Sequence, residues 1–194
     1  MIKLLVALCI VIASYTFSFS FGGVLDCGQT LTENNTTYTL SQNLDCEEGI
    51  SIKGKYITVD CNGYGLFPSL EQGIGIEINK SSFVTIKNCW IEGWEEGIVV
   101  DSSKNITLLG DVIVYNEGDG ISFSKSRNTT IQDTASEGNG ISGFVEYKGS
   151  NTTIEDSYMI DNGDVDILLI APKTLQFSLT NTEGNFSLTK EGGN

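Results

Sequence analysis

The chain has 194 residues, a length that suits a single domain, and a formal net charge of −14. It contains no histidine, which excludes Ser-His-Asp triads, Cys-His dyads and every metal site with histidine ligands. Its 25 acidic residues against 11 basic ones argue against nucleic acid as a partner, because such a chain cannot neutralise phosphates.

The first residues of the chain are typical of a secretory signal. Lys3 is the only charged residue before Asp26, and residues 4–13 form an uninterrupted apolar run. We therefore expect residues 1–22 to be a signal peptide, cleaved within residues 14–23, and the protein to be secreted or displayed on the cell surface. The alternative is an uncleaved anchor, because the uncharged stretch is long enough to span a bilayer. That segment would then be the chain's only contact with a membrane.

Four cysteines remain after the signal, and an even number in an exported chain indicates disulfides. We expect Cys27 to pair with Cys46, which would fix the first strand near the mature N-terminus. Cys61 and Cys89 would form a second bridge. The alternative for this second pair is two buried thiols in neighbouring turns.

The rest of the chain is built of repeats of about 22 residues. Each copy begins with glycine and an alternating run, such as GIEI at residues 75–78 or GIVV at residues 97–100, and a second run such as ITL at residues 106–108 follows. Alternation with a period of two predicts short strands with one buried face. Such strands must stack to close a core, which predicts a parallel β-solenoid of about seven turns. A β-sandwich is the alternative, but few two-residue hairpin turns are present.

Three runs carry the repeat pattern most clearly: GISIKGKYITVDCNGYG, SSFVTIKNCWIEGWEEGIVV and SSKNITLLGDVIVYNEGDGISF. They resemble the NosD-like and pectate-lyase-like superfamily, in the form common in archaeal secreted and surface proteins. The resemblance covers roughly residues 27–180 and implies an all-β, single-stranded right-handed parallel β-helix. We expect residues 23–48 to form an N-terminal capping turn and residues 49–194 the repeats. Lyases, hydrolases, epimerases, adhesins and structural spikes share this fold, so the fold alone does not assign the function.

The catalytic motifs implied by that resemblance are not found in the sequence. Lyases of the superfamily imply an Arg or Lys base, but the single arginine, Arg127, lies in a turn; polygalacturonase-type hydrolases imply clustered Asp together with His. Glycoside hydrolysis in general needs only two carboxylates. Asp133 and Asp156 share a repeat position, and Asp111 lies one residue further along in the preceding turn. The alternative is that these are turn residues that cap backbone amides.

Calcium is the one cofactor for which the sequence offers candidates. The DNGDVD turn contains Asp161, Asp164 and Asp166, and oxygen ligands of this kind suit calcium. The EF-hand pattern is missing, and glycine and asparagine in such turns are also explained by positive φ alone. The resemblance carries a copper association. Copper prefers His, Met and thiolates. The chain has no His, and Met159 is the only methionine that would remain after cleavage, so copper binding has little support.

Aromatic residues make a polysaccharide or surface glycan the expected partner. Trp90 and Trp94 lie close together, and Tyr158 aligns with Trp90 two turns later in the pattern. Outward rings on a flat solenoid face can stack on sugar rings. The alternative is that these rings shield strand ends or pack against a loop at residues 66–72.

The expected function is a secreted or cell-surface module that binds carbohydrate or serves in adhesion. A polysaccharide-active enzyme that uses carboxylates and a structural envelope stalk are the alternatives. Several N-glycosylation sequons share one repeat position, so repeat duplication would also produce them. The sequons are at Asn34, Asn35, Asn79, Asn105, Asn128, Asn151 and Asn185.

Overall fold

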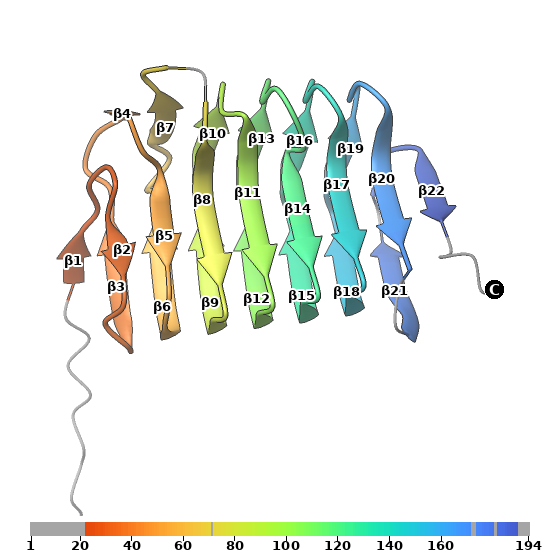
Figure 1. The fold of residues 1–194 in the computed structure, drawn as a ribbon, viewed down its shortest axis with the longest axis horizontal. Coiled ribbons are helices and arrows are strands. Elements are labelled where there is room, and N and C mark those ends of the chain that lie inside the picture. The colour runs from red at the N-terminus through yellow and green to blue at the C-terminus, as the bar shows by residue number, and fades with distance from the viewer. Residues whose placement is uncertain (1–21, 71, 172–173, 181, 190–194) are drawn as a thin grey trace, which may run out of the picture.

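The computed structural model describes residues 22–189 except 71, 172–173 and 181, and these form three parallel sheets wound into one solenoid (Figure 1). Sheets A and B contain eight strands each and sheet C contains six. The all-β parallel solenoid predicted from the repeats is confirmed. The expected signal peptide lies outside the described residues apart from Gly22. Within the described part, no helix is long and apolar enough to cross a membrane.

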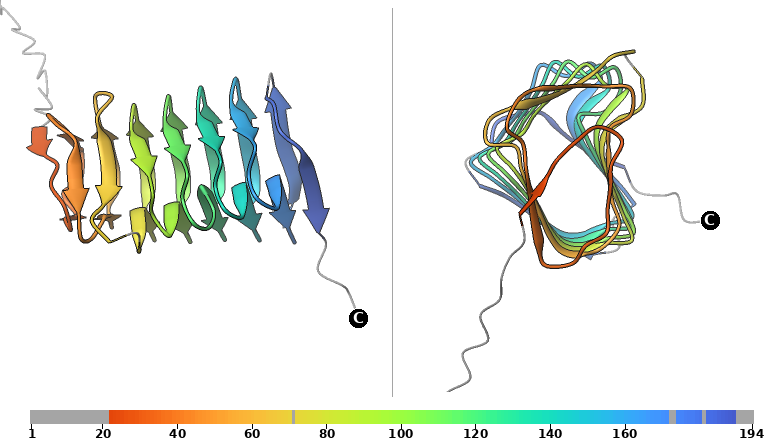
Figure 2. Two further views of the ribbon diagram at one scale, coloured as in Figure 1. Left: turned by 90° about the horizontal axis from the view of Figure 1, so that it is seen from above. Right: turned by 90° about the vertical axis from the view of Figure 1, so that its left-hand side faces the viewer.

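The chain passes from sheet B to sheet A, then to sheet C, and returns to sheet B one turn later (Figures 1 and 2). Sheet A consists of β1 (Gly22–Val24), β3 (Thr36–Thr39), β6 (Lys55–Asp60), β9 (Ser82–Lys87), β12 (Lys104–Leu109), β15 (Arg127–Gln132), β18 (Ser150–Glu155) and β21 (Thr174–Thr180). Sheet B consists of β2 (Thr30–Leu31), β5 (Ile50–Ile52), β8 (Ile74–Asn79), β11 (Glu96–Asp101), β14 (Ile121–Ser124), β17 (Ser142–Tyr147), β20 (Val165–Ile170) and β22 (Phe186–Thr189). Sheet C consists of β4 (Leu44–Cys46), β7 (Gly65–Pro68), β10 (Trp90–Glu92), β13 (Val112–Val114), β16 (Ala135–Glu137) and β19 (Tyr158–Ile160).

Stacking in register turns the period-two alternation of each strand into columns that run along the axis. In sheet B, Ile76 lies opposite Ile98, and Ile98 lies opposite Ile121. All three are fully buried, whereas the residues that directly follow them in their strands, Glu77, Val99 and Ser122, are partly exposed. Inward columns from all three sheets meet in one hydrophobic core. Burial of these columns supplies the main driving force for stacking, because one turn cannot enclose a core alone.

From β6 to β21, each corner between sheets includes a residue with positive φ. Asparagine, aspartate and glycine tolerate this conformation best. The corner residues between sheets A and C are Asn88, Gly110, Asp133 and Asp156. Those between sheets B and A are Lys80, Ser102, Lys125 and Lys148.

Both expected disulfides are present. Cys27 pairs with Cys46 and Cys61 with Cys89, with Cα–Cα distances of 5.3 Å and 4.7 Å. Residues 22–48 contribute strands β1 to β4 to all three sheets, so the first bridge holds together the first turn of the solenoid.

Candidate functional site

Four outward residues of sheet C form one column over four successive turns. Trp90 lies opposite Val112 in the next turn. Ala135 follows Val112, and Tyr158 follows Ala135. The two rings at the ends are exposed, Trp90 by 42% and Tyr158 by 51%. They are three turns apart, not the two that the sequence pattern indicated, which is about 14 Å at the usual strand spacing.

The small residues between the two rings leave a hollow on sheet C. It has a volume of about 460 Å³, and its lining includes Val112, Ala135 and Tyr158. Trp90, in the turn before Val112, does not line the hollow itself, and its indole is held in place because Nε1 donates a hydrogen bond to Glu92 Oε2 at 2.7 Å. A fixed ring loses less conformational entropy when a ligand stacks on it.

All three predicted carboxylates line this hollow, and Asp133 and Asp156 do so in adjacent turns. The backbone N–H of Asp133 donates to the carbonyl of Glu155 in the following turn, so Asp133 and Asp156 hold equivalent corner positions. Both side chains are exposed and both residues have positive φ. The sequence therefore placed them correctly in one column, beside the aromatic residue Tyr158.

Asp111, the third predicted carboxylate, is a buried capping residue. It is 1% exposed and accepts hydrogen bonds from the backbone N–H groups of Cys89 at 2.9 Å and Leu109 at 3.1 Å. Burial raises the pKa of its carboxyl to about 7. The interpretation as a cap of backbone amides holds for this residue.

Trp94, in contrast to Trp90, is not available to a ligand. It is fully buried, and its indole Nε1 donates to the carbonyl of Leu66 at 3.0 Å. The backbone N–H of Trp94 donates to the side chain of Asn116. The backbone N–H and side-chain amide of Asn116 donate in turn to Asn139 Oδ1. Trp94 thus occupies an inward corner position that buried asparagines fill in later turns, and its assignment to a carbohydrate site is wrong.

The three calcium candidates do not form a cluster of ligands. Asp161 and Asp164 are exposed, but Asp166 is 5% exposed, and its carboxylate accepts hydrogen bonds from Asn162 and from the backbone of Asn185. Within the described residues, no group of three His, Cys, Asp or Glu side chains is placed to hold a metal ion.

A pair of carboxylates that the sequence did not suggest as catalytic, Glu96 and Asp119, lies at the corner between sheets C and B. Burial, together with the nearby Asp119 and Glu95, raises the pKa of Glu96 to about 7. Its Oε2 is buried without a hydrogen-bond partner among the described residues. Burial also raises the pKa of Asp119, which accepts a hydrogen bond from the backbone N–H of Ser142 at 3.0 Å. These shifts depend on three-dimensional burial, which no local pattern reveals.

Three of the predicted glycosylation sites form one exposed column on sheet A. Asn128 Nδ2 donates to Asn105 Oδ1 at 3.1 Å, and Asn151 Nδ2 donates to Asn128 Oδ1 at 2.9 Å. Neighbouring turns are only about 4.8 Å apart, so three glycans could not be attached to this column together. Asn34 and Asn35 lie between β2 and β3, Asn79 is the last residue of β8, and Asn185 directly precedes β22.

The sequence matches the family model described as "Right handed beta helix region" over residues 23–185. No curated protein matches it. Among solved structures, the catalytic domain of an α-1,3-glucanase of family GH87, in complex with tetrasaccharides, superposes with a TM-score of 0.53 at 15% identity. The match covers 84% of this chain and 33% of the glucanase domain.

Two epimerases are also similar in structure. The A-module of the mannuronan C-5 epimerase AlgE4 from Azotobacter vinelandii gives a TM-score of 0.45 at 14% identity, covering 87% of this chain and 66% of the module. The periplasmic alginate epimerase AlgG gives a TM-score of 0.47 at 15% identity, covering 79% of this chain and 50% of that protein. The chain thus spans from one third to about two thirds of these structures.

Proposed function

Because the chain belongs to the right-handed β-helix family, we propose that it is a secreted or cell-surface β-helix module that binds a carbohydrate chain along sheet C. One observation carries the proposal. Trp90 and Tyr158 are exposed in a single outward column, and Val112 and Ala135, which stand between them in that column, line a hollow together with Tyr158.

The chemistry of the hollow suits the faces and edges of uncharged sugar rings. Apolar sugar faces stack on aromatic rings, which Trp90 and Tyr158 offer at the two ends of their column. Hydroxyl groups at the sugar edges can donate to the carboxylates of Asp133 and Asp156, and such charge-assisted hydrogen bonds are the stronger kind. Those two carboxylates would repel an acidic polymer, so a neutral glycan is the expected ligand.

Two further observations support an extracellular carbohydrate role. Two disulfides within one small domain are typical of proteins that fold outside the reducing cytosol. The glucanase with a similar fold holds tetrasaccharides, so a ligand of this class is compatible with the solenoid surface.

The proposal can be tested by size-exclusion chromatography of the oxidised protein with a panel of neutral polysaccharides. We expect polymer of unchanged length to co-elute with the protein. The double variant Trp90→Ala, Tyr158→Ala should lose co-elution. The matched control is Tyr56→Ala, Phe83→Ala, which removes an exposed aromatic pair on sheet A and should retain it. If both variants retained the polymer equally, the hollow on sheet C would not be the binding site. If the parent protein retained no polymer, the alternative of a structural envelope stalk would be favoured.

A polysaccharide-active enzyme is the second candidate, and the Glu96–Asp119 pair favours it. A carboxyl with a pKa of about 7 can act as a general acid at neutral pH while a neighbouring carboxylate acts as base or nucleophile. The same chromatography decides, because an enzyme would shorten the polymer. That shortening should disappear in Glu96→Gln and persist in the exposed control Glu117→Gln.

A further inference from the structure

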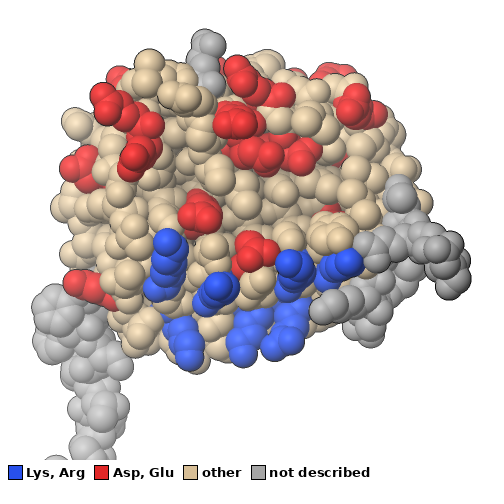
Figure 3. Space-filling model, viewed as in Figure 1, with Lys and Arg blue, Asp and Glu red and all other residues tan. Residues whose placement is uncertain are grey.

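Positive charge is concentrated along one edge of this acidic molecule. Seven of the eight Lys and Arg residues that the structure describes lie at the corner between sheets B and A (Figure 3). We call this edge the basic ridge, and its members are Lys53, Lys55, Lys80, Lys104, Lys125, Arg127 and Lys148. The acidic residues visible in the same view gather mainly at the opposite edge (Figure 3).

The register places at least one cation in each of five successive turns. One column of this corner contains Lys80, Ser102, Lys125 and Lys148. The neighbouring column contains Lys55, Ser82, Lys104, Arg127 and Ser150. Where one column has serine, the other has lysine, so the line of charge is continuous at the strand spacing of about 4.8 Å.

The folding of the corner does not require these cations. Lys80, Lys125 and Lys148 adopt positive φ, a conformation that suits asparagine or glycine better than lysine. The equivalent corner between sheets A and C uses asparagine, aspartate and glycine. Like charges in adjacent turns also repel one another. Lysine at this corner is therefore better explained by a ligand than by stability.

The cations are available to a ligand. The side chains of Lys53, Lys55, Lys80, Lys104, Lys125 and Arg127 are exposed, and none is ion-paired with a carboxylate in the described part of the chain. Lys148 lies over the ring of Tyr147, with Nζ 4.8 Å from its centroid. By contrast, the remaining described cation, Lys87, is ion-paired with Asp60 at 2.8 Å.

A ladder of buried serine hydroxyls links the turns beneath the ridge. The backbone N–H of Ser81 donates to Ser103 Oγ at 3.0 Å, and that of Ser103 donates to Ser126 Oγ at 3.3 Å. All three serines are buried. A buried hydroxyl ladder of this kind fixes the spacing of the lysines on either side of it, which lowers the entropic cost of binding a regular polymer.

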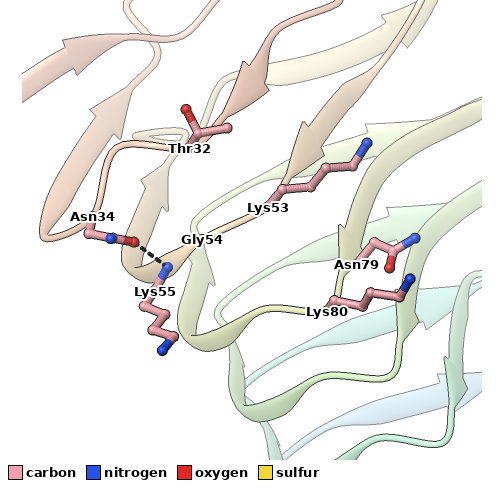
Figure 4. A pocket seen from close by; sticks show the side chains of 7 residues that line it. All are labelled: Thr32, Asn34, Lys53, Gly54, Lys55, Asn79 and Lys80. Carbon is pink, nitrogen blue, oxygen red and sulfur yellow. Dashed lines mark hydrogen bonds between the residues drawn. The ribbon is translucent and has the colours of Figure 1, made fainter.

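Open hollows accompany the charges. One, of about 610 Å³, is lined by residues that include Asn34, Lys53, Asn79 and Lys80 (Figure 4). In the close-up, Lys53, Asn79 and Lys80 extend on one side of the turn at Gly54, and Lys55 extends on the other. A second hollow, of about 290 Å³, lies between Lys80, Lys104 and Arg127.

The sheet A border of the ridge offers groups that recognise sugar. Tyr56 directly follows Lys55, and its exposed ring stacks on that of Phe83 with centroids 4.6 Å apart. In the next turns the same column continues as the exposed amides of Asn105, Asn128 and Asn151. Rings can stack on sugar faces, and amides can bond to sugar hydroxyls.

We infer that the basic ridge binds a linear anionic polysaccharide that runs along the solenoid axis, with its acid groups on the cations and its sugar rings over Tyr56, Phe83 and the asparagine column. A single polymer chain fits a ridge one or two cations wide. A nucleic acid duplex would bring phosphates against Glu77 and Asp101, which flank the ridge on sheet B. The basic ridge differs from the hollow on sheet C in position and in the charge of its expected ligand. The inference about the ridge does not depend on the function proposed for that hollow.

The test measures binding of fluorescently labelled polygalacturonate, dextran sulfate, uncharged dextran and single-stranded oligo(dT) to the oxidised protein in 50 mM NaCl. We expect at least one of the two acidic polysaccharides to bind, with an affinity that falls as salt is raised, and any binding of uncharged dextran to be independent of salt. Tighter binding of polygalacturonate would assign carboxylated polymers and tighter binding of dextran sulfate would assign sulfated ones. Tighter binding of oligo(dT) than of both would overturn the assignment to polysaccharide.

Variants connect the binding to the ridge. Replacing Lys80, Lys104, Lys125 and Arg127 by glutamine should weaken binding at least about tenfold, since each exposed ion pair contributes modestly. Binding should stay weak when four acidic residues far from the ridge are also neutralised, which restores the net charge: Glu47→Gln, Glu48→Gln, Glu95→Gln and Glu117→Gln.

Three control variants complete the design. Lys87→Gln and the sheet C double variant Trp90→Ala, Tyr158→Ala should both bind the acidic polysaccharide as the parent protein does. Lys80→Arg, Lys104→Arg, Lys125→Arg should also bind, because charge is conserved. Binding that survives the four ridge substitutions, with an unchanged thermal unfolding midpoint to confirm folding, would overturn the inference.

Discussion

Glu146 lies directly opposite Phe123 in sheet B, and so places a carboxyl in a column that is apolar in the preceding turns. It is 2% exposed, and Thr152 Oγ1 donates a hydrogen bond to it. Thr152 Oγ1 also lies 2.7 Å from Thr129 Oγ1. Burial raises the pKa of the Glu146 carboxyl. Ionisation of this carboxyl is therefore less favourable in the folded chain than in the unfolded chain.

Glu146→Gln is expected to stabilise the protein at pH 8 by about 1–3 kcal/mol and to change its stability little at pH 5. The folded pKa is raised, so the stability tied to protonation is present below the unfolded pKa and is lost as pH rises through the folded pKa. Glutamine keeps an acceptor for Thr152 without a charge. Urea unfolding at the two pH values checks this, with the exposed Glu117→Gln as control. An equal effect at both pH values would contradict it.

Asn139→Ala is expected to cost about 2–4 kcal/mol. Asn139 is 1% exposed, and its Oδ1 accepts hydrogen bonds from the backbone and the side chain of Asn116. Its Nδ2 donates to Asn162 Oδ1 at 2.9 Å. The substitution would leave these buried groups without partners. Urea unfolding of Asn128→Ala, in the exposed column of sheet A, is the matched control and should show a loss of less than about 1 kcal/mol. Equal losses would mean that the buried asparagine ladder contributes no more to the free energy of unfolding than the exposed column does.

The strands could be predicted because their alternation directly records which side chains point inward. Ile76 and Ile98, for example, stand in the same phase after their glycines, and the structure stacks them as expected. The same reasoning found the shared position of Asp133 and Asp156. The two disulfides were predicted on other grounds, from the even number of cysteines in an exported chain, and both are present.

The corners could not be predicted because they have no alternation. Trp94 holds the inward corner position that Asn116 holds in the next turn. This equivalence can be recognised only once the register of the whole turn is known. The basic ridge was missed for a related reason. Its members occur in short segments about 22 residues apart, such as KGK at residues 53–55 and KSR at residues 125–127, and stacking alone brings them into one line.

Trp94→Ala should destabilise the protein by about 3–5 kcal/mol, while Trp90→Ala should cost less than about 1 kcal/mol. The first ring is fully buried and hydrogen-bonded to Leu66, and the second is 42% exposed. Chemical unfolding of the two variants under identical conditions measures the contrast. Similar losses would contradict the opposite placement of the two rings.

Replacing Cys61 and Cys89 together by alanine is expected to cost about 3 kcal/mol. The bridge spans 28 residues, and closing a loop of that size removes conformational freedom mainly from the unfolded chain. The pair Cys27→Ala, Cys46→Ala, whose bridge spans 19 residues, should cost slightly less. Unfolding of each variant in non-reducing buffer gives the two values. A loss well below 1 kcal/mol for either would indicate that its cysteines are not bridged.

Glu96→Gln should raise stability at pH 8 by an amount on the order of 1 kcal/mol, because solvent screens a half-buried carboxyl. The pKa of Glu96 is about 7 in the folded chain against an ordinary value of 4.5, so the folded state binds the proton more tightly. Stability tied to this proton therefore falls as pH rises from about 4.5 to 7. Thermal unfolding at pH 5 and pH 8 tests this, and pH 5 stays above the isoelectric point near 4.2. If Glu96→Gln were destabilising at pH 8, Glu96 would have to be ionised and favourably bound in the folded protein, which would also remove it as a general acid.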